Sequence, residues 1–221
     1  MIAFISLSIV AISIWLIGLY HARADWGGPS VNWLDGWTRL LCRYLHRLPE
    51  QYIALPESGA AIVVANHVSG VDPLLLIAAS RRPLRFLIAR EEYQRPIVNW
   101  LFKKAGCIPV DRSGRPEQAL RQALRALQQG EVIALFPHGK IHLDSDPPRK
   151  IKGGVARLAN WSGACVFPVR IDGVSAQGKV FTAPFVPSRA QLRIAPPLTC
   201  SAESVAQCLK AITQAIETPA R

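Results

Sequence analysis

Hydrophobic positions along most of the chain follow two alternating patterns. Short continuous apolar runs are typical of buried strands, and helical spacing of apolar positions is typical of helices packed on one face. The runs of strand type are residues 60–65, 84–89, 107–110, 131–136 and 165–171. The segments of helical type are residues 73–79, 96–105, 116–129 and 153–161. Strands that alternate with helices predict an α/β fold with a mostly parallel or mixed sheet flanked by helices.

The last part of the chain follows a different pattern. Residues 174–197 are interrupted by Pro and Gly and predict strand and loop. Ser201 is placed to cap a final helix, because apolar residues recur after it at helical spacing. These residues are Val205, Leu209, Ile212 and Ile216.

The first twenty residues contain no charged side chain. As a helix this run reaches about 28 Å, close to the hydrocarbon thickness of a bilayer, and it predicts a transmembrane or membrane-anchor helix over residues 1–22. A cleaved secretory signal is the alternative, because Ala22, Arg23 and Ala24 resemble a cleavage site. Arginines follow the run and none precedes it, so the positive-inside rule predicts that the main domain is cytoplasmic.

Residues 23–50 are predicted to form an amphipathic region at the membrane interface. Trp33, Trp37 and Tyr44 recur there at helical spacing, with arginines between them. Aromatic rings at headgroup depth and cations near lipid phosphates suit such a helix. An ordinary amphipathic helix packed on the domain fits the same pattern. Residues 51–221 are then predicted to form one globular domain.

Composition narrows the class of protein further. Half of the residues are hydrophobic and 19% are charged, which excludes intrinsic disorder. The net charge is +11, and residues 81–157 carry most of it, with 16 Lys and Arg against 7 Asp and Glu. This excess predicts an anionic partner. The chain shows no nucleic-acid-binding motif, so a phosphorylated metabolite or a lipid surface is the favoured partner.

The five cysteines are odd in number and contain no C-x-x-C pair. This arrangement argues against a disulfide framework and against a thiolate zinc site. Single buried thiols in a reducing compartment are the favoured interpretation. The residues are Cys42, Cys107, Cys165, Cys200 and Cys208.

Candidate chemistry begins directly after the strand at residues 60–65, where His67 is followed by Asp72. The carboxyl ends of strands are where α/β sheets bind ligands. Five residues of regular helix turn the chain by about 500°, so the two side chains meet only through a turn, which Ser69 and Gly70 can supply. Asp72 can then orient the imidazole as a base near neutral pH. A helix cap at Asp72 beside an uninvolved strand-end histidine is the structural alternative.

Asn66, His67 and Asp72 form an NH-x4-D motif that resembles the first block of the glycerolipid acyltransferase family, which includes the bacterial 1-acylglycerol-3-phosphate acyltransferases. The resemblance extends over roughly residues 60–171, in the order that the family's blocks have. The further blocks are GCIPVDR at residues 106–112, FPHGK at 136–140, KGGVARLA at 152–159 and VFPV at 166–169.

The resemblance implies transfer of a fatty acyl group from acyl-CoA or acyl-carrier protein to the hydroxyl of a lysophospholipid-like acceptor, 1-acylglycerol-3-phosphate or a related lipid. It implies that His67 is the general base and that Asp72 orients it. The residues that it implies for substrate binding are Asn66, Arg112, His138, Gly139 and Lys140. It implies no metal and no cofactor other than the donor substrate. The implied partners are the lipid acceptor, the acyl donor and the membrane surface, with no nucleic acid. The implied location is a bacterial inner membrane, with the catalytic domain on the cytoplasmic side.

The third block departs from the family's FPEGTR pattern. His138 replaces the glutamate, and Lys140 and Ile141 replace the threonine and arginine. We hypothesise that the chemistry at His67 is retained while the acceptor pocket differs, with Asp144 or Asp146 restoring a carboxylate.

Two other interpretations remain open at this point. One is a catalytically silent lipid- or acyl-carrier-binding module of the same fold. The other is a metal-dependent hydrolase, with His138, His142 and Asp144 as candidate metal ligands.

Overall fold

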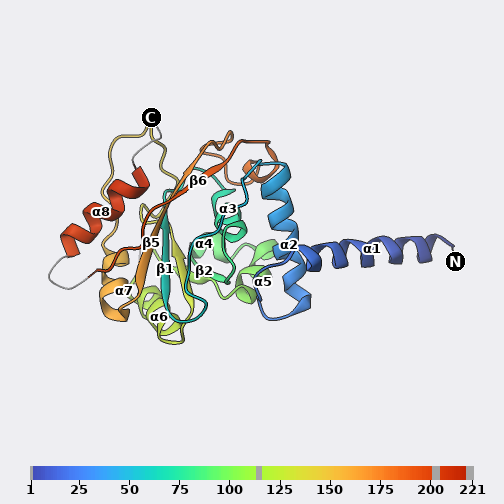
Figure 1. Ribbon diagram of the computed structural model, residues 1–221, viewed down its shortest axis with the longest axis horizontal. Helices are drawn as coiled ribbons and strands as arrows, with labels where there is room; N and C mark the ends of the chain where they lie inside the picture. Colours follow the sequence, from blue (N-terminus) through green and yellow to red (C-terminus); the bar gives the residue numbers. More distant parts are fainter. Residues whose placement is uncertain (1, 113–115, 201–204, 218–221) are drawn as a thin grey trace.

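The structure is a computed structural model that describes residues 2–112, 116–200 and 205–217, and in them a six-stranded sheet is covered by helices on both faces (Figure 1). The strands are β1 (Ala61–Ala65), β2 (Leu84–Ala89), β3 (Ile108–Val110), β4 (Val132–Leu135), β5 (Cys165–Asp172) and β6 (Gln191–Ile194). Their order is β3-β2-β4-β1-β5-β6, and all neighbouring pairs are parallel except β5 and β6. The predicted α/β fold with a mixed sheet is therefore confirmed.

The helices agree with the predicted segments to within a few residues. They are α1 (Ile2–His21), α2 (Pro29–Tyr44), α3 (Asp72–Ala78), α4 (Arg90–Tyr93), α5 (Pro96–Lys104), α6 (Pro116–Gln128), α7 (Gly154–Ser162), the 3-10 turn η1 (Ala183–Phe185) and α8 (Val205–Glu217). The short α4 was not predicted. The predicted cap at Ser201 lies outside the described residues.

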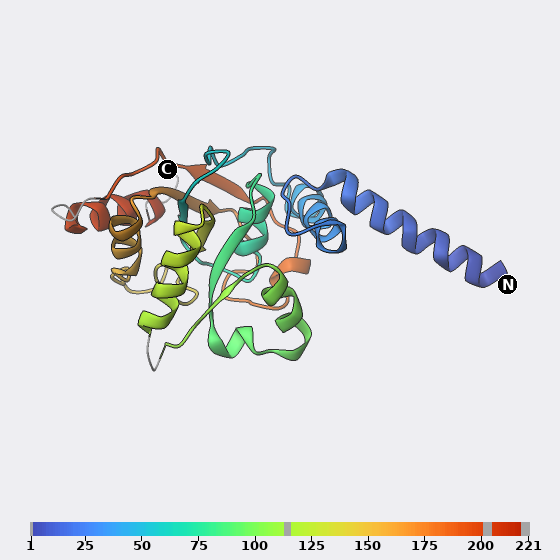
Figure 2. The same ribbon diagram turned by 90° about the horizontal axis from the view of Figure 1, so that it is seen from below.

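Strand β1 lies inside the sheet, between β4 and β5. Each of its residues is fully buried, and the side chains alternate between two hydrophobic clusters, one on each face. Helices α2 and α3 cover one face, and α6, α7 and α8 cover the other (Figure 2). This packing holds the carboxyl end of β1 at the middle of one sheet edge, which is where His67 follows.

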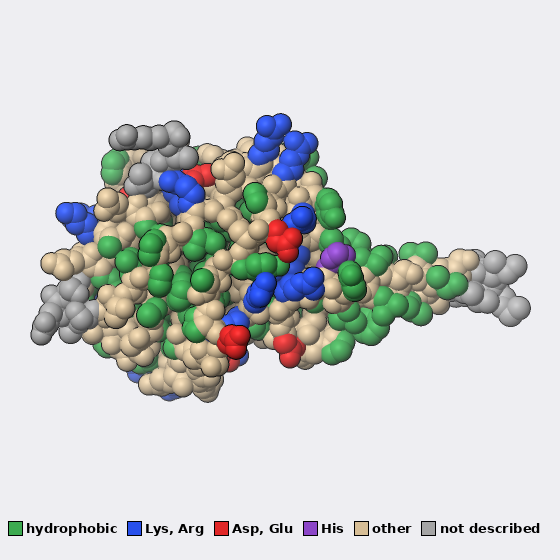
Figure 3. Space-filling view, in the orientation of Figure 1, with side chains coloured by type: hydrophobic (Ala, Val, Ile, Leu, Met, Phe, Trp, Pro, Cys, Tyr) green, Lys and Arg blue, Asp and Glu red, His purple; other side chains and the backbone are tan. Residues whose placement is uncertain are grey.

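Helix α1 projects from the body of the molecule (Figures 1 and 2). Hydrophobic side chains cover much of its described surface, and Lys and Arg side chains gather near its base (Figure 3). Within the described ranges, however, we find no helix whose length and apolar character suffice to cross a bilayer. The transmembrane helix predicted over residues 1–22 is therefore not supported. The boundaries at residues 22 and 50 stay predictions.

Helices α1 and α2 cross where Gly18 meets Gly36. A Cβ atom on Gly36 would lie 1.8 Å from the carbonyl oxygen of Gly18, so only glycine permits this approach. The buried carboxylate of Asp35 accepts hydrogen bonds from the Arg23 backbone amide, at 2.8 Å, and from the guanidinium of Arg39, at 2.7 Å. Arg39 also donates to carbonyl groups at the end of α3. Thus α2 packs on the domain, as one of the two interpretations of this segment predicted.

The prediction of single thiols is wrong for two of the five cysteines. Cys200 and Cys208 form a disulfide, with their Cα atoms 5.5 Å apart. Cys200 therefore lies beside the first turn of α8, which holds Cys208, a proximity that the spacing of these two residues does not reveal. Cys42, Cys107 and Cys165 are free thiols, and burial raises the pKa of Cys42 to about 12 and that of Cys107 to about 11.

Candidate active site

The chain between β1 and α3 turns so that His67 and Asp72 meet. The imidazole Nδ1 of His67 lies 2.8 Å from Oδ2 of Asp72. The same carboxylate accepts hydrogen bonds from the backbone amides of Val68 and Ser69 and from the Ser69 hydroxyl, at 2.6 to 2.8 Å. Asp72 is fully buried. Four donors therefore surround this carboxylate, and the turn that the sequence predicted brings the pair together.

The surroundings of His67 expose one edge of its ring. Its Nδ1 faces the Asp72 carboxylate, and the neutral tautomer that donates from Nδ1 leaves a lone pair on Nε2 for a bound molecule. The ring stacks on Phe136 with 4.2 Å between centroids and 16° between planes. The His67 side chain is 19% exposed. The imidazole is thus held on two sides and accessible to a bound molecule at the third.

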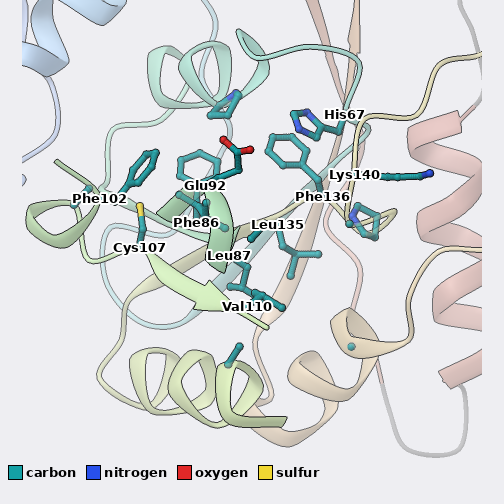
Figure 4. Close-up of a pocket in the computed structure, with 18 of the residues that line it drawn as sticks. His67, Phe86, Leu87, Glu92, Phe102, Cys107, Val110, Leu135, Phe136 and Lys140 are labelled. Carbon is teal, nitrogen blue, oxygen red and sulfur yellow. The ribbon is translucent and has the colours of Figure 1, made fainter. Parts of the chain in front are cut away.

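His67 borders a cavity of about 1020 Å³ (Figure 4). The cavity extends under the carboxyl ends of β2, β3 and β4, and α2, α5, α6 and α7 contribute to its walls. Apolar side chains dominate the part beyond Phe136. Those labelled in Figure 4 are Phe86, Leu87, Phe102, Cys107, Val110 and Leu135. Such a volume and lining suit a long hydrocarbon chain.

Four cationic side chains also line this cavity, namely Arg112, Lys140, Lys152 and Arg157. The first residues of α7 also line the cavity, and the positive end of the helix dipole there favours an anion. The cavity therefore joins an accessible imidazole, an apolar region and a basic region, which suits an amphiphile with a negatively charged headgroup.

Gly139 lies in a left-handed conformation, with φ 74°, in the loop after β4. A Cβ atom there would be 2.8 Å from Nζ of Lys152, so glycine lets this ammonium group approach the loop. Lys140, the next residue, also lines the cavity. Arg112 is 41% exposed and lies 3.5 Å from Glu91. The structure thus places three predicted binding residues, Arg112, Gly139 and Lys140, at the cavity that His67 borders.

Asn66, predicted as a substrate-binding residue, lies elsewhere. It is buried, and its side-chain amide donates to the Ile171 carbonyl at 2.9 Å and accepts from the Ile171 amide at 2.7 Å. Asn66 therefore fastens the end of β1 to β5. Its polar atoms are occupied by backbone and do not face the cavity.

His138, the other predicted binding residue, also points away from the cavity. Its Nε2 lies 2.9 Å from the carboxylate of Glu217 at the end of α8, and its ring stacks on His142 with centroids 4.6 Å apart. The residue is 2% exposed. Burial lowers the pKa of His138, an effect that the hydrogen bond to the Glu217 carboxylate opposes. This ring is buried against α8, so the structure does not support contact between His138 and a substrate.

Neither Asp144 nor Asp146, which we hypothesised to restore the carboxylate of the acceptor pocket, lines the cavity. Asp144 pairs with Arg170, and Asp146 accepts a hydrogen bond from the Leu143 amide and lies 3.6 Å from His142. The carboxylate that meets His138 is that of Glu217, outside the cavity lining. The sequence carries no signal for this contact, because 79 residues separate the two partners.

The metal-site interpretation finds no support in the described ranges, where no three His, Cys, Asp or Glu side chains are grouped so that they can hold a metal ion. Although His138 and His142 lie close together, the ion pair with Arg170 occupies Asp144, which was the third proposed ligand.

A feature that sequence reasoning missed is the stacking of Phe136 on His67.

Comparison with known proteins agrees with what the geometry of the site indicates. A family model described as acyltransferase matches residues 47–172. The chain is 32% identical over 113 residues to N-acylphosphatidylethanolamine synthase of Arabidopsis thaliana, an alignment that covers 47% of this chain and 40% of the relative. It is 23% identical to 1-acyl-sn-glycerol-3-phosphate acyltransferase of Bacillus subtilis, covering 58% and 63%. It is 35% identical to lyso-ornithine lipid O-acyltransferase of Pseudomonas aeruginosa, covering 50% and 44%.

These alignments leave part of each relative unmatched, since the chain spans 40% to 63% of the length of the three relatives. Among solved structures, the crystal structure of the 1-acyl-sn-glycerophosphate (LPA) acyltransferase from Thermotoga maritima superposes with a TM-score of 0.65. It has 21% sequence identity, and the match covers 84% of this chain and 77% of that one. At this identity the likeness concerns the fold.

Proposed function

The chain belongs to the acyltransferase family, and from this premise we propose that it transfers a fatty acyl group from a thioester donor to the hydroxyl of a lysophospholipid-like acceptor. One observation supports the proposal most directly. The imidazole of His67, oriented by the buried Asp72, borders a cavity with an apolar part and a basic part. That combination matches the reacting hydroxyl, the acyl chain and the charged headgroup of the two substrates.

In the proposed reaction His67 acts as general base. Its Nε2 takes the proton from the acceptor hydroxyl while the hydroxyl oxygen attacks the carbonyl carbon of the thioester. The tetrahedral intermediate then collapses, the carbon–sulfur bond breaks, and the imidazolium returns the proton to the departing thiolate. Asp72 stabilises the imidazolium and fixes its orientation through Nδ1.

The basic part of the cavity is proposed to bind the negatively charged headgroup. Arg112 and Lys140 are placed to contact it, and the guanidinium fork of an arginine suits a phosphate in particular. Lys152 and Arg157 add positive charge to the same region. The apolar lining beyond Phe136 is proposed to take an acyl chain. Neither a metal nor a cofactor is required, because the donor is itself the activated substrate.

Membrane association is part of the proposal. Described side chains of α1 such as Leu7, Ile9 and Tyr20 are 69%, 59% and 78% exposed. Apolar surface of this size gains free energy when it enters lipid, and the acceptor itself resides there. We therefore propose that α1 inserts into a membrane surface. The cytoplasmic side of a bacterial inner membrane stays a prediction.

The experiment that tests this function uses the whole chain and radiolabelled acyl donors. Acyl-CoA and acyl-carrier protein are each incubated with a panel that contains 1-acylglycerol-3-phosphate, lyso-ornithine lipid and lysophosphatidylethanolamine, and products are identified by mass. Formation of one acylated lipid with release of free thiol supports the proposal and identifies the donor. Binding of the acyl donor without product on any acceptor supports the second candidate, a silent lipid- or carrier-binding module.

A further inference from the structure

Exposed large hydrophobic side chains are distributed unevenly over the described part of the molecule. They lie on α1, on α2, on α5 and on the segment of residues 180–186, and Trp161 of α7 is the one exception. Helices α1, α2 and α5 gather at one end of the molecule, and α6, α7 and α8 lie toward the other (Figures 1 and 2). An exposed apolar surface confined to one end indicates a surface for contact.

Helix α5 shows why part of this surface is exposed. At 100° per residue its side chains divide into three faces. Leu101 and Phe102 line the cavity that His67 borders. Asn99 and Lys103 line a separate hollow of about 530 Å³. Ile97 and Trp100 form the third face with Lys104 and are 94% and 54% exposed. None of the residues of α5 is buried, so this helix offers its apolar face to something outside the chain.

The segment of residues 180–186 continues this apolar face. The guanidinium carbon of Arg95 lies 4.5 Å from the ring centroid of Phe181 and connects the segment to the start of α5. Phe181 is 59% and Phe185 is 76% exposed. We call the exposed apolar set on α5 and this segment the apolar rim. Its residues are Ile97, Trp100, Val180, Phe181, Phe185 and Val186.

The apolar rim is joined directly to the turn that holds His67 and Asp72. The Gly70 amide donates to the Lys179 carbonyl at 2.9 Å, and the Gly178 amide donates to the Val68 carbonyl at 2.8 Å. Val180 belongs to the rim and also lines the cavity. A ligand that covers the rim therefore lies next to the cavity that His67 borders.

Charge indicates which kind of partner the rim accepts. Lys103 and Lys104 are exposed at the end of α5, beside the apolar face. Arg90 and Lys103 line the separate hollow of about 530 Å³ described above. Half-exposed tryptophan with flanking lysines matches the boundary between headgroups and acyl chains, where cations meet lipid phosphates. An acidic protein would match the lysines but not six adjoining apolar side chains.

We propose that the apolar rim is a second membrane contact, separate from α1, that seats the border of the cavity on an anionic bilayer. This contact rests on the proposed function and deepens it. An acceptor dissolved in that bilayer then reaches His67 without passing through water. Helix α1 supplies attachment, and the rim sets which face of the domain meets the lipid.

The first test measures binding without turnover, so that it is independent of the proposed function. The double variant Ile97→Ser/Trp100→Ser and the control Trp161→Ser are floated with neutral vesicles and with vesicles that contain phosphatidylglycerol. Trp161 is a matched control because it is 53% exposed and lies on α7. Loss of the two rim side chains is expected to lower the vesicle partition constant about tenfold, whereas the control stays within about twofold. Lys103→Gln/Lys104→Gln is expected to weaken binding to the anionic vesicles alone.

Equal partition of the rim variant and the control would overturn the proposal. So would a rim variant that changes the oligomeric state in sedimentation while vesicle binding stays the same, because the rim would then be a protein interface. Phe181→Ser/Phe185→Ser removes the other half of the rim and gives the same reading should the first variant unfold.

The second test links the rim to delivery of the acceptor. With an acceptor embedded in vesicles, the rim variant is expected to lose about tenfold in rate. With a short-chain acceptor dissolved in water, its rate is expected to equal that of the unaltered chain. Equal loss on both acceptors would overturn the delivery role. Should the unaltered chain acylate nothing, the proposed function fails, and the binding test still decides the membrane contact.

Discussion

Two histidine–carboxylate pairs in this molecule have nearly the same length but opposite surroundings. His67 lies 2.8 Å from Asp72, and His138 lies 2.9 Å from Glu217. In the first pair the carboxylate is fully buried and the imidazole is 19% exposed. In the second the imidazole is 1% exposed and the carboxylate is 38% exposed.

This inversion teaches what a general base requires beyond a nearby acid. An imidazole that works as a base needs one nitrogen held by the acid and the other open to a substrate. His67 has both, since Asp72 holds Nδ1 and the ring borders the cavity. His138 presents Nε2 to Glu217, while its Nδ1 is buried and makes no hydrogen bond within the described structure. The second pair is therefore suited to joining α8 to the loop after β4.

Replacing the first imidazole gives the largest expected effect. His67→Ala removes the proposed base, and we expect kcat/KM for acyl transfer to fall by about 10²- to 10⁴-fold while vesicle binding is unchanged. Product formation with a labelled donor measures it. The control is His21→Ala, because His21 ends α1 and does not line the cavity. Full turnover by the His67 variant would assign the proton transfer to another group.

Weakening the acid of the first pair comes next. Asp72→Asn keeps the size of the side chain but removes the charge that stabilises the imidazolium. We expect kcat to fall by about 10²-fold, the lower end of what general-base catalysis contributes, with a small change in KM. Asp146→Asn is the matched control, because Asp146 lies 3.6 Å from His142 in a looser contact. If both substitutions reduced kcat equally, the special position of Asp72 would have no catalytic meaning.

Removing the cations near the first pair tests what its cavity binds. Arg112→Ala or Lys140→Ala should raise KM for a phosphate-bearing acceptor by about tenfold, since a charge-assisted hydrogen bond contributes about 1.5–3 kcal/mol. An acceptor without a phosphate should be affected little. Steady-state kinetics on both acceptors measures the difference. Arg121→Ala, on the exposed side of α6, serves as the control. A change in kcat alone would place these cations at the reacting centre.

The second pair is expected to matter least for turnover and most for stability in acid. Burial, together with the electrostatic effect of His142 and Arg149, holds the pKa of His138 below its ordinary value of 6.5, although Glu217 raises it. Below about pH 6.5 the unfolded chain takes up a proton that the folded chain resists, so this residue makes the free energy of unfolding decrease as pH falls. Above that pH its contribution is constant.

His138→Gln should therefore reduce the loss of stability between pH 7.5 and pH 5.5 while kcat stays within about threefold. Urea unfolding at the two pH values measures the free energy of unfolding. His46, which is also buried and whose pKa burial also lowers, continues to contribute in the variant. A steeper loss in the variant than in the unaltered chain would show that His138 is protonated in the folded protein.

Local patterns predicted most of the fold, because they are set by residues near one another in the chain. The apolar runs at β1, β2 and β5 and the period of α6 appear where the sequence indicated. The turn that joins His67 to Asp72 was predictable for the same reason, since Ser69 and Gly70 lie between them.

Long-range contacts explain what sequence reasoning missed. Glu217 reaches His138 because α8 packs across β5, and nothing near either residue indicates that approach. Asn66 directly precedes the proposed base, so the sequence indicated a role in substrate binding. Its side-chain amide instead makes hydrogen bonds with the backbone of Ile171 on another strand. In each case the partner is chosen by how elements pack, which the spacing of residues along the chain does not encode.

The contact between Gly18 and Gly36 fixes how α1 and α2 cross. Because Gly18 and Gly36 lack side chains, the two backbones touch, and the direction in which α1 leaves the body is determined there. With α1 in lipid, that direction sets how high His67 stands above the bilayer. The absence of two Cβ atoms, at Gly18 and Gly36, would then set the distance between the imidazole and its lipid substrate.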